Sequence, residues 1–171
     1  MKIILKIFLI IVLVSLSVLA QQTTFQDPLL DHMTGKWILK GTIAGKETTH
    51  DIITEWVLGH QYIQIHETSR EKNAKGEAEY EAIVYIGWDK VLQEYACLWL
   101  DVTSGEGLSN GIIGHARRDK DRIAFLFKVN DRSLFHTTFL YDKDTDTWQW
   151  LMDSEENGKL QHFARVKLTR E

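Results

Sequence analysis

The chain has 171 residues and carries 20 lysines and arginines against 24 aspartates and glutamates. This acidic balance, without a Lys/Arg run of the kind that a polyanion requires, argues against a nucleic-acid partner. Cys97 is the only cysteine, so no internal disulfide can form, and its aromatic and apolar sequence neighbours predict a buried, unreactive thiol.

The first 20 residues differ in composition from the rest of the chain. Lys2 and Lys6 form a basic start, an apolar run follows from Ile7 to Val14, and Val18-Leu19-Ala20 fits the small-x-small pattern of a cleavage site. The pattern predicts a signal peptide over residues 1–20, cut after Ala20, and a periplasmic or secreted mature domain over residues 21–171. Because the apolar run is shorter than the ~20 residues of a membrane-spanning helix, we expect no integral membrane span after cleavage; an uncleaved anchor is the alternative.

One short helix is predicted near the start of the mature domain, whose 151 residues suit a single core. Asp27 can serve as the N-cap, Pro28 fits the first helical position, and Gly35 follows the end of the helix near Met33. No other segment reads as helical, so we expect strands and turns in the rest of the domain.

Short strand-like runs fill the chain from Lys36 onward. They are rich in Ile, Val, Thr, Tyr, Phe and Trp, and turn signals separate them at the ~8 to 12 residue spacing of a sandwich or barrel. Segments such as Glu156-Asn157-Gly158 carry the residues that tolerate the backbone angles of tight hairpins. The pattern predicts ten strands, at residues 36–44, 48–57, 60–69, 78–88, 92–101, 108–118, 121–129, 133–141, 147–154 and 159–169.

The lengths of the connections indicate how these strands pair. Parallel neighbours need crossovers of a dozen or more residues, which the short connections do not supply, so sequential antiparallel pairing is expected. An open sheet of ten strands would expose two hydrophobic edges, whereas a closed barrel has none. The predicted fold class is therefore all-β, an up-and-down antiparallel β-barrel of about ten strands with one short N-terminal helix.

Several short motifs occur in order along the mature domain: Gly35-Lys36-Trp37, Glu55 to Gly59, Ile86 to Asp89, Trp99 to Asp101, and Arg165 to Arg170. A Gly-x-Trp that opens the first strand after a short helix is similar to the motif that closes the barrel of calycins, which include lipocalins and fatty-acid-binding proteins. The whole series resembles the bacterial family called domain of unknown function 1579, which is lipocalin-like in its pattern, although Leu168 stands where that family usually has Tyr. The resemblance implies a calycin-like barrel and brings no established activity or ligand.

The base of the barrel is predicted from the first of these motifs. We expect Trp37 to plug this end, next to Gly35, with Arg170 stacked on the indole as a cation–π partner. These three residues are interpreted as structural.

The motif search assigns no catalytic residue, metal or other cofactor. The sequence has no His-x-x-x-His on a helix and no Cys/His cluster. Gly107 to Gly111 has the Gly-x-Ser-x-Gly spacing, but no helix is predicted after it, as a nucleophile elbow requires. Asp142 to Asp146 opens like a calcium-binding loop, but Thr147 and Asp153 stand where that loop needs Gly and a bidentate Glu, so a solvated hairpin is expected. Thr103 to Gly107 is expected to be a loop, either a plain connector or a lid at the barrel mouth.

The lumen of the barrel is the expected place for a ligand. Strand residues alternate between two faces, and a ligand-binding barrel commonly turns amphipathic aromatic side chains and a few polar groups inward. On this basis the predicted cavity wall consists of Tyr62, His66, Tyr95, Trp99, Phe125, Phe127 and His136.

Three functions are compatible with such a barrel. The leading hypothesis is that a small hydrophobic molecule binds in the lumen. The alternatives are a cofactor-free isomerase, cyclase or hydrolase that uses a cavity His or Asp, and a filled barrel whose outer face binds a protein. A roomy, mainly apolar interior would favour the first, and converging polar groups with shifted pKa values would favour the enzyme.

The signal-peptide prediction can be tested directly on the exported protein. Intact mass or N-terminal sequencing should show a chain that starts at Gln21, because the peptidase accepts the small side chains at Val18 and Ala20. Recovery of the chain in a membrane fraction with Met1 still attached would contradict the prediction.

Overall fold

The computed structural model describes residues 25–103 and 112–171, which form one helix and eleven strands. The elements are α2 (Pro28–Met33), β1 (Gly35–Ile43), β2 (Lys46–Val57), β3 (Tyr62–Ser69), β4 (Glu81–Asp89), β5 (Glu94–Asp101), β6 (Ile113–Ala116), β7 (Arg118–Asp119), β8 (Arg122–Lys128), β9 (Ser133–Asp142), β10 (Thr147–Glu156) and β11 (Lys159–Arg170). The predicted all-β class is confirmed. In the described ranges no helix has the length and apolar character to span a membrane. The predicted signal peptide and residues 104–107 of the predicted loop lie outside the described ranges.

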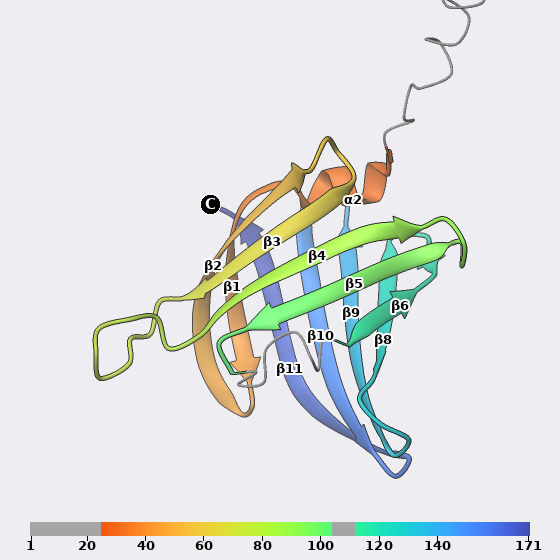
Figure 1. The fold of residues 1–171 in the computed structure, drawn as a ribbon. Coiled ribbons are helices and arrows are strands. Elements are labelled where there is room, and N and C mark those ends of the chain that lie inside the picture. The colour runs from red at the N-terminus through yellow and green to blue at the C-terminus, as the bar shows by residue number, and fades with distance from the viewer. Residues whose placement is uncertain (1–24, 104–111) are drawn as a thin grey trace, which may run out of the picture.

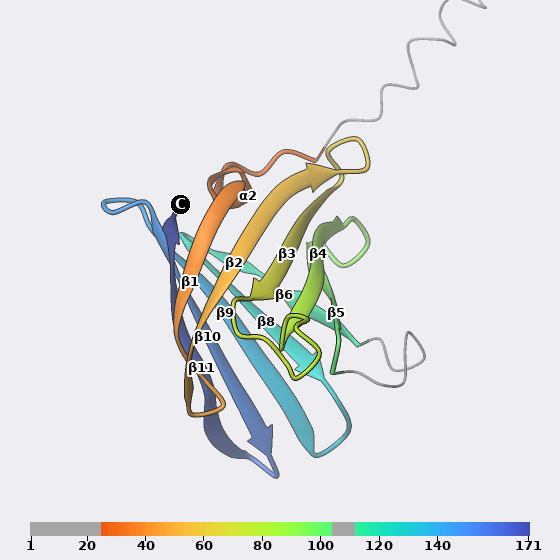
Figure 2. The same cartoon turned by 90° about the vertical axis from the view of Figure 1, so that its left-hand side faces the viewer.

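All the strands belong to one antiparallel sheet, in which consecutive strands are neighbours from β1 to β6 and from β7 to β11. Two further pairings close the sheet into a barrel: β1 pairs with β11, and β6 pairs with β8 at His115 and Leu126 (Figures 1 and 2). The two-residue strand β7 pairs only with β8, so ten strands form the wall. The predicted up-and-down barrel is confirmed. In place of the one strand predicted at 108–118, the described residues contain two, β6, which begins at Ile113, and β7.

Helix α2 lies across one end of this barrel (Figure 1). Its N-cap is Asp27, whose carboxylate accepts hydrogen bonds from the backbone N–H groups of Leu29 and Leu30 at 2.8 and 3.3 Å. A helix of six residues is too short to be stable by propensity alone. Burial of Leu29, Leu30 and Met33 stabilises it, so α2 serves as an apolar plug for that end.

The base of the barrel brings together Gly35, Trp37 and Arg170. Trp37 is 1% exposed and its indole N–H donates to the Met33 carbonyl at 2.8 Å, while the Arg170 guanidinium carbon lies 3.7 Å from the centre of the indole ring. Gly35 has φ +119°, and a Cβ there would lie 2.5 Å from the guanidinium, so this position requires glycine. Arg170 also donates to the Thr34 carbonyl at 2.5 Å, which ties the last strand to the end of the helix.

The half of the lumen next to α2 is packed solid. Its largest buried side chains include Trp37, Trp148, Trp150 and Phe139. The rings of Phe139 and Trp150 form a tilted pair with centroids 4.7 Å apart, and Trp148 pairs with Tyr141 at 4.9 Å. Cys97 lies on the inward face of β5 with no exposed surface, and burial raises the pKa of its thiol. The predicted burial of Cys97 is confirmed.

Removal of the base tryptophan should destabilise the whole barrel. We expect Trp37→Ala to lower the free energy of unfolding by ~3 to 5 kcal/mol, because it leaves a cavity under the Arg170 guanidinium and removes a buried hydrogen bond. Chemical denaturation followed by circular dichroism measures the change. Val91→Ala, at a side chain that is 89% exposed, is the control, and equal stability of the two variants would contradict the role of the base.

Candidate functional site

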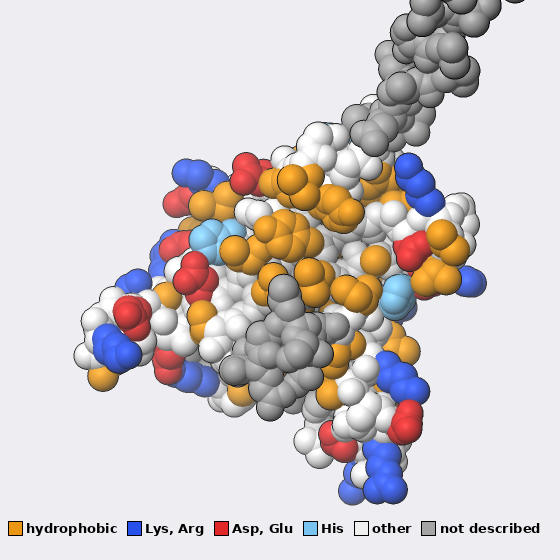
Figure 3. All heavy atoms as spheres, viewed as in Figure 1, with side chains coloured by type: hydrophobic (Ala, Val, Ile, Leu, Met, Phe, Trp, Pro, Cys, Tyr) orange, Lys and Arg blue, Asp and Glu red, His pale blue; other side chains and the backbone are white. Residues whose placement is uncertain are grey.

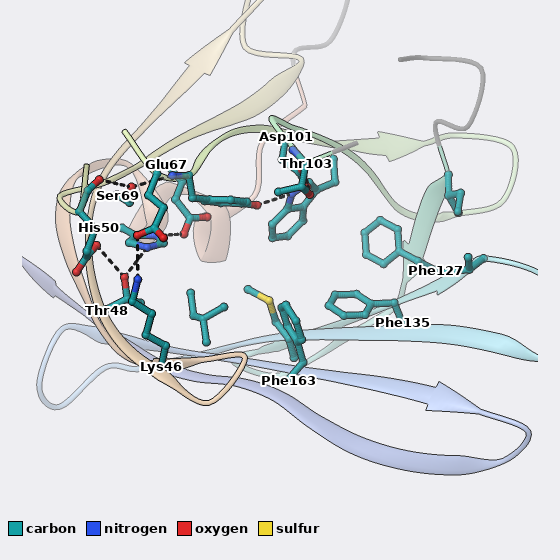
Figure 4. Close-up of a pocket in the computed structure, with 18 residues that line it drawn as sticks. Lys46, Thr48, His50, Glu67, Ser69, Asp101, Thr103, Phe127, Phe135 and Phe163 are labelled. Atoms are coloured by element: carbon teal, nitrogen blue, oxygen red, sulfur yellow. Dashed lines mark hydrogen bonds and ion pairs between the residues drawn. The ribbon is translucent and has the colours of Figure 1, made fainter. Parts of the chain in front are cut away.

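A cavity of about 480 Å³ occupies the end of the barrel opposite α2. It lies where β1, β3 and β5 end and where β2, β9 and β11 begin, so residues far apart in the sequence share its wall. Figure 4 shows its two sides, with Thr48, His50 and Glu67 on one side and Phe127, Phe135 and Phe163 on the other. The cavity therefore has walls of different chemistry.

The apolar wall comes mainly from the second half of the chain. Phe135 on β9 and Phe163 on β11 pack edge to face with their centroids 5.6 Å apart. The remaining apolar lining side chains are Ile43, Trp99, Ile112, Phe127, Val129 and Met152. Such a surface favours the apolar body of a ligand because its burial removes hydrocarbon from water.

The polar wall centres on a buried pair formed by His50 of β2 and Glu67 of β3. The hairpin register sets His50 opposite Ser69 and Ile52 opposite Glu67, so His50 and Glu67 are diagonal neighbours on the inward face. Their side chains are 5% and 1% exposed, and His50 Nδ1 lies 2.5 Å from Glu67 Oε1. A buried carboxylate requires such a partner, because an unpaired charge in the interior is costly.

A hydrogen-bond chain continues from His50 to the rim. His50 Nε2 lies 2.8 Å from the Thr48 hydroxyl, which donates to Glu71 Oε2 at 3.0 Å. Since the single hydroxyl proton is used for Glu71, Nε2 of His50 is the donor to Thr48. Both ring nitrogens of His50 are therefore engaged within the wall.

The second oxygen of Glu67 differs from the first. Glu67 Oε2 is buried and has no hydrogen-bond partner among the described residues. An unpaired buried acceptor costs about 1–3 kcal/mol, and more when it is charged. Glu67 is one of the residues that line the cavity, so a ligand donor that reaches this oxygen would satisfy it.

Tyr80 and Trp99 join the polar wall to the apolar one. The Trp99 indole N–H donates to the Tyr80 hydroxyl at 3.2 Å, and the Tyr80 ring stacks on His50 with centroids 5.8 Å apart. Burial raises the pKa of the Tyr80 phenol well above its usual value, and the negative charges of Glu67 and Asp101 raise this pKa further. Tyr80 is therefore a neutral hydrogen-bonding group at physiological pH rather than a base.

Negative charge predominates around the cavity. Its wall contains the carboxylates of Glu67, Glu71, Glu79 and Asp101. Within the described part of the chain, Lys46 is the one lysine or arginine that lines it, and its ammonium group pairs with Glu79 at 2.9 Å. The wall is thus net negative even when His50 is protonated.

Two of the seven side chains predicted for the cavity wall line it, Trp99 and Phe127. Tyr95 and Phe125 also point inward, but they lie in the solid half next to α2, where the Tyr95 hydroxyl donates to Asp27 and Phe125 packs on Phe139. The expectation for these two is corrected because alternation along a strand gives the face of a side chain and not its depth in the barrel.

Tyr62, His66 and His136 were expected inside and lie on the outer face. His66 pairs with Glu81 at 2.7 Å and His136 with Glu155 at 2.8 Å, both on the partly exposed outside of the barrel. Tyr62 lines an outer hollow beside Tyr85, Leu98 and other apolar side chains of β4 and β5, which form part of the hydrophobic surface in Figure 3. In both strands the inward residues are the neighbours of those predicted. Strand β3 turns Ile63, Ile65 and Glu67 inward. Strand β9 turns Thr137, Phe139 and Tyr141 inward.

The sequence analysis missed most of the polar wall, including Thr48, His50, Glu67, Glu71 and Tyr80. One signal for the central pair was available in the hairpin between β2 and β3. Pairing of Val57 with Tyr62 across this turn fixes the register, and counting back along both strands sets His50 diagonal to Glu67. The positions of Glu71 and Tyr80, in the long connection to β4, have no comparable signal.

No part of the site has the features of a metal centre. Among the described residues no group of three or more His, Cys, Asp or Glu side chains could hold a metal ion. The predicted hairpin at Asp142 to Asp146 is confirmed: Asp142 accepts hydrogen bonds from the Asp144 N–H at 3.0 Å and the Thr145 hydroxyl at 2.8 Å. Thr103, the described part of the predicted loop, contributes to the cavity wall.

Comparison with known proteins adds no relative. No model of a known protein family matches the chain, and no curated protein matches it either.

Loss of the buried imidazole should be far more harmful than loss of an exposed one. We expect His50→Ala to lower the free energy of unfolding by about 3–5 kcal/mol, because it leaves Glu67 buried without its partner. His66→Ala is a matched control, since it breaks a His–Glu pair of similar geometry whose side chains are 36% and 48% exposed, and should cost at most about 1 kcal/mol. Equal losses in urea denaturation would contradict the assignment of His50 to a buried ion pair.

Proposed function

We propose that the barrel binds a small, largely hydrophobic molecule with a polar end in its lumen. The observation that supports this proposal is the cavity of about 480 Å³, whose apolar and polar walls face each other. Ligand sites commonly have this volume and this combination of an apolar surface with a few convergent polar groups. The apolar body would lie against Phe127, Phe135 and Phe163, and the polar end would meet the wall around Glu67.

The same geometry gives less support to an enzyme. A general base must offer a free nitrogen or oxygen to its substrate, and His50 offers none, because its two nitrogens are engaged with Glu67 and Thr48. Glu67 Oε2 has no partner among the described residues, but it is buried. The Ser69 hydroxyl donates to the Glu71 carbonyl and accepts from the Tyr80 N–H, so it has no adjacent base that would activate it. Cys97 is buried with a raised pKa, which disfavours its reactive thiolate.

A protein-binding role for a filled barrel is also less well supported, because the lumen holds a cavity at one end. We further propose that the protein is exported after cleavage at Ala20 and that it is a calycin-like relative of the family called domain of unknown function 1579. These proposals rest on the sequence patterns of residues 1–20 and of the ordered motifs from Gly35 to Arg170.

Tryptophan emission should report occupancy of the cavity. Decanol, a neutral apolar probe, should shift or quench the emission, because Trp99 lines the cavity and the other tryptophans do not. Trp99→Phe should remove most of this change at unchanged fold. Fluorescence titration with wild type and variant measures the effect.

Trp88→Phe is the control for this titration, because Trp88 lies in the wall of the outer hollow and should leave the change intact. Mass spectrometry of small molecules extracted from the natively purified protein offers an independent readout. The proposed function is wrong if no member of a panel of neutral, cationic and anionic apolar compounds binds.

A further inference from the structure

We infer that the ligand of this cavity is an amine, an apolar molecule whose polar end is a cationic nitrogen with N–H donors, and that Glu67 is its primary acceptor. The inference rests on the proposed function and specifies the chemical class of the ligand. Three features of the described residues support it: the sign of the charge around the cavity, the unpaired oxygen of Glu67, and the aromatic side chains of Tyr80 and Trp99 in the cavity wall.

The charge of the wall selects against an anionic ligand. Four carboxylates line the cavity, and the one lysine among the described lining residues already pairs with Glu79. A carboxylate or phosphate head would enter a net negative site in which no described arginine is present to receive it. A cationic head gains from the same charges, and most from Glu67, the one buried carboxylate among the four.

Glu67 marks the point in the wall where a donor is needed. Its Oε1 is satisfied by His50 at 2.5 Å, whereas its Oε2 is buried without a partner among the described residues. Glu71 differs, since its carboxylate accepts hydrogen bonds from the Thr48 hydroxyl and the Thr49 N–H at 3.0 and 3.2 Å. An ammonium group supplies N–H donors and the compensating positive charge together, which a neutral alcohol does not.

Aromatic rings next to this acceptor suit a cation as well. The Tyr80 ring stacks on His50, and the Trp99 indole N–H donates to the Tyr80 hydroxyl, so Trp99 is joined to the His50–Glu67 pair through Tyr80. An aromatic face attracts a cation through its quadrupole, and the attraction grows when the site excludes water. The apolar body of the amine would then extend toward Phe135 and Phe163, whose rings cover the opposite wall.

Three ligands with the same alkyl chain and different heads test the inference. At pH 7, decylamine should bind the wild-type protein roughly 10- to 100-fold more tightly than decanoate, and decanol should bind with intermediate affinity. Isothermal titration calorimetry below the aggregation limit of each ligand gives affinity and stoichiometry, and decylamine should displace decanol at one site. Equal or tighter binding of decanoate overturns the inference and leaves the proposed function standing. Failure of all three to bind refutes the proposed function itself.

Variants locate the acceptor. Glu67→Gln keeps the shape of the side chain and a hydrogen-bond acceptor for His50, and it should weaken decylamine binding about tenfold with little effect on decanol. Glu81→Gln, which removes a carboxylate from the outer face, is the matched control and should change neither affinity. Full retention of the amine preference in folded Glu67→Gln overturns the role of Glu67. Should this variant fail to fold, the ranking of the three heads in the wild type still decides whether the ligand is an amine.

Discussion

The contact between Trp37 and Arg170 is the constraint on which the rest of the barrel depends. A closed sheet of ten strands has two ends, and here one end is filled by the indole, the guanidinium above it and the apolar face of α2. Packing of this end to the density of an ordinary core supplies the stability that a chain without an internal disulfide needs. The opposite end can then hold a cavity, because the fold does not depend on filling it.

The pair formed by His50 and Glu67 shows how a polar wall survives inside such a barrel. Two inward titratable groups on adjacent strands would each be costly alone, and as a pair they compensate each other. The compensation is incomplete, since one oxygen of Glu67 has no partner among the described residues. An interior selected only for stability would replace the pair with aliphatic side chains, as β3 does at Ile63 and Ile65. The polarity of this wall is therefore not explained by stability.

Local patterns in the sequence predicted the fold well and the site poorly. Some features depend on residues close together in the sequence, and the structure contains each of them. They are the N-cap at Asp27, the hairpin turns and the Gly35-x-Trp37 motif of the base. The cavity wall depends on the phase of each strand and on depth along it, and both are set by the closed barrel as a whole. Trp99 and Tyr95 illustrate this, because they share a strand and a face, yet one lines the cavity and the other contacts the helix at the far end.

The pairing of β1 with β11 has a kinetic consequence. Strand β1 begins at Gly35 and its partner ends at Arg170, so the seam that closes the barrel joins segments separated by most of the chain. Until β11 has been synthesised and has paired with it, β1 has only one of its two neighbours. Closure is therefore a late, long-range step, of the kind that makes β-barrels slow to fold. A chain in this state keeps the edges of β1 and β11 unpaired, and such edges can pair with another chain.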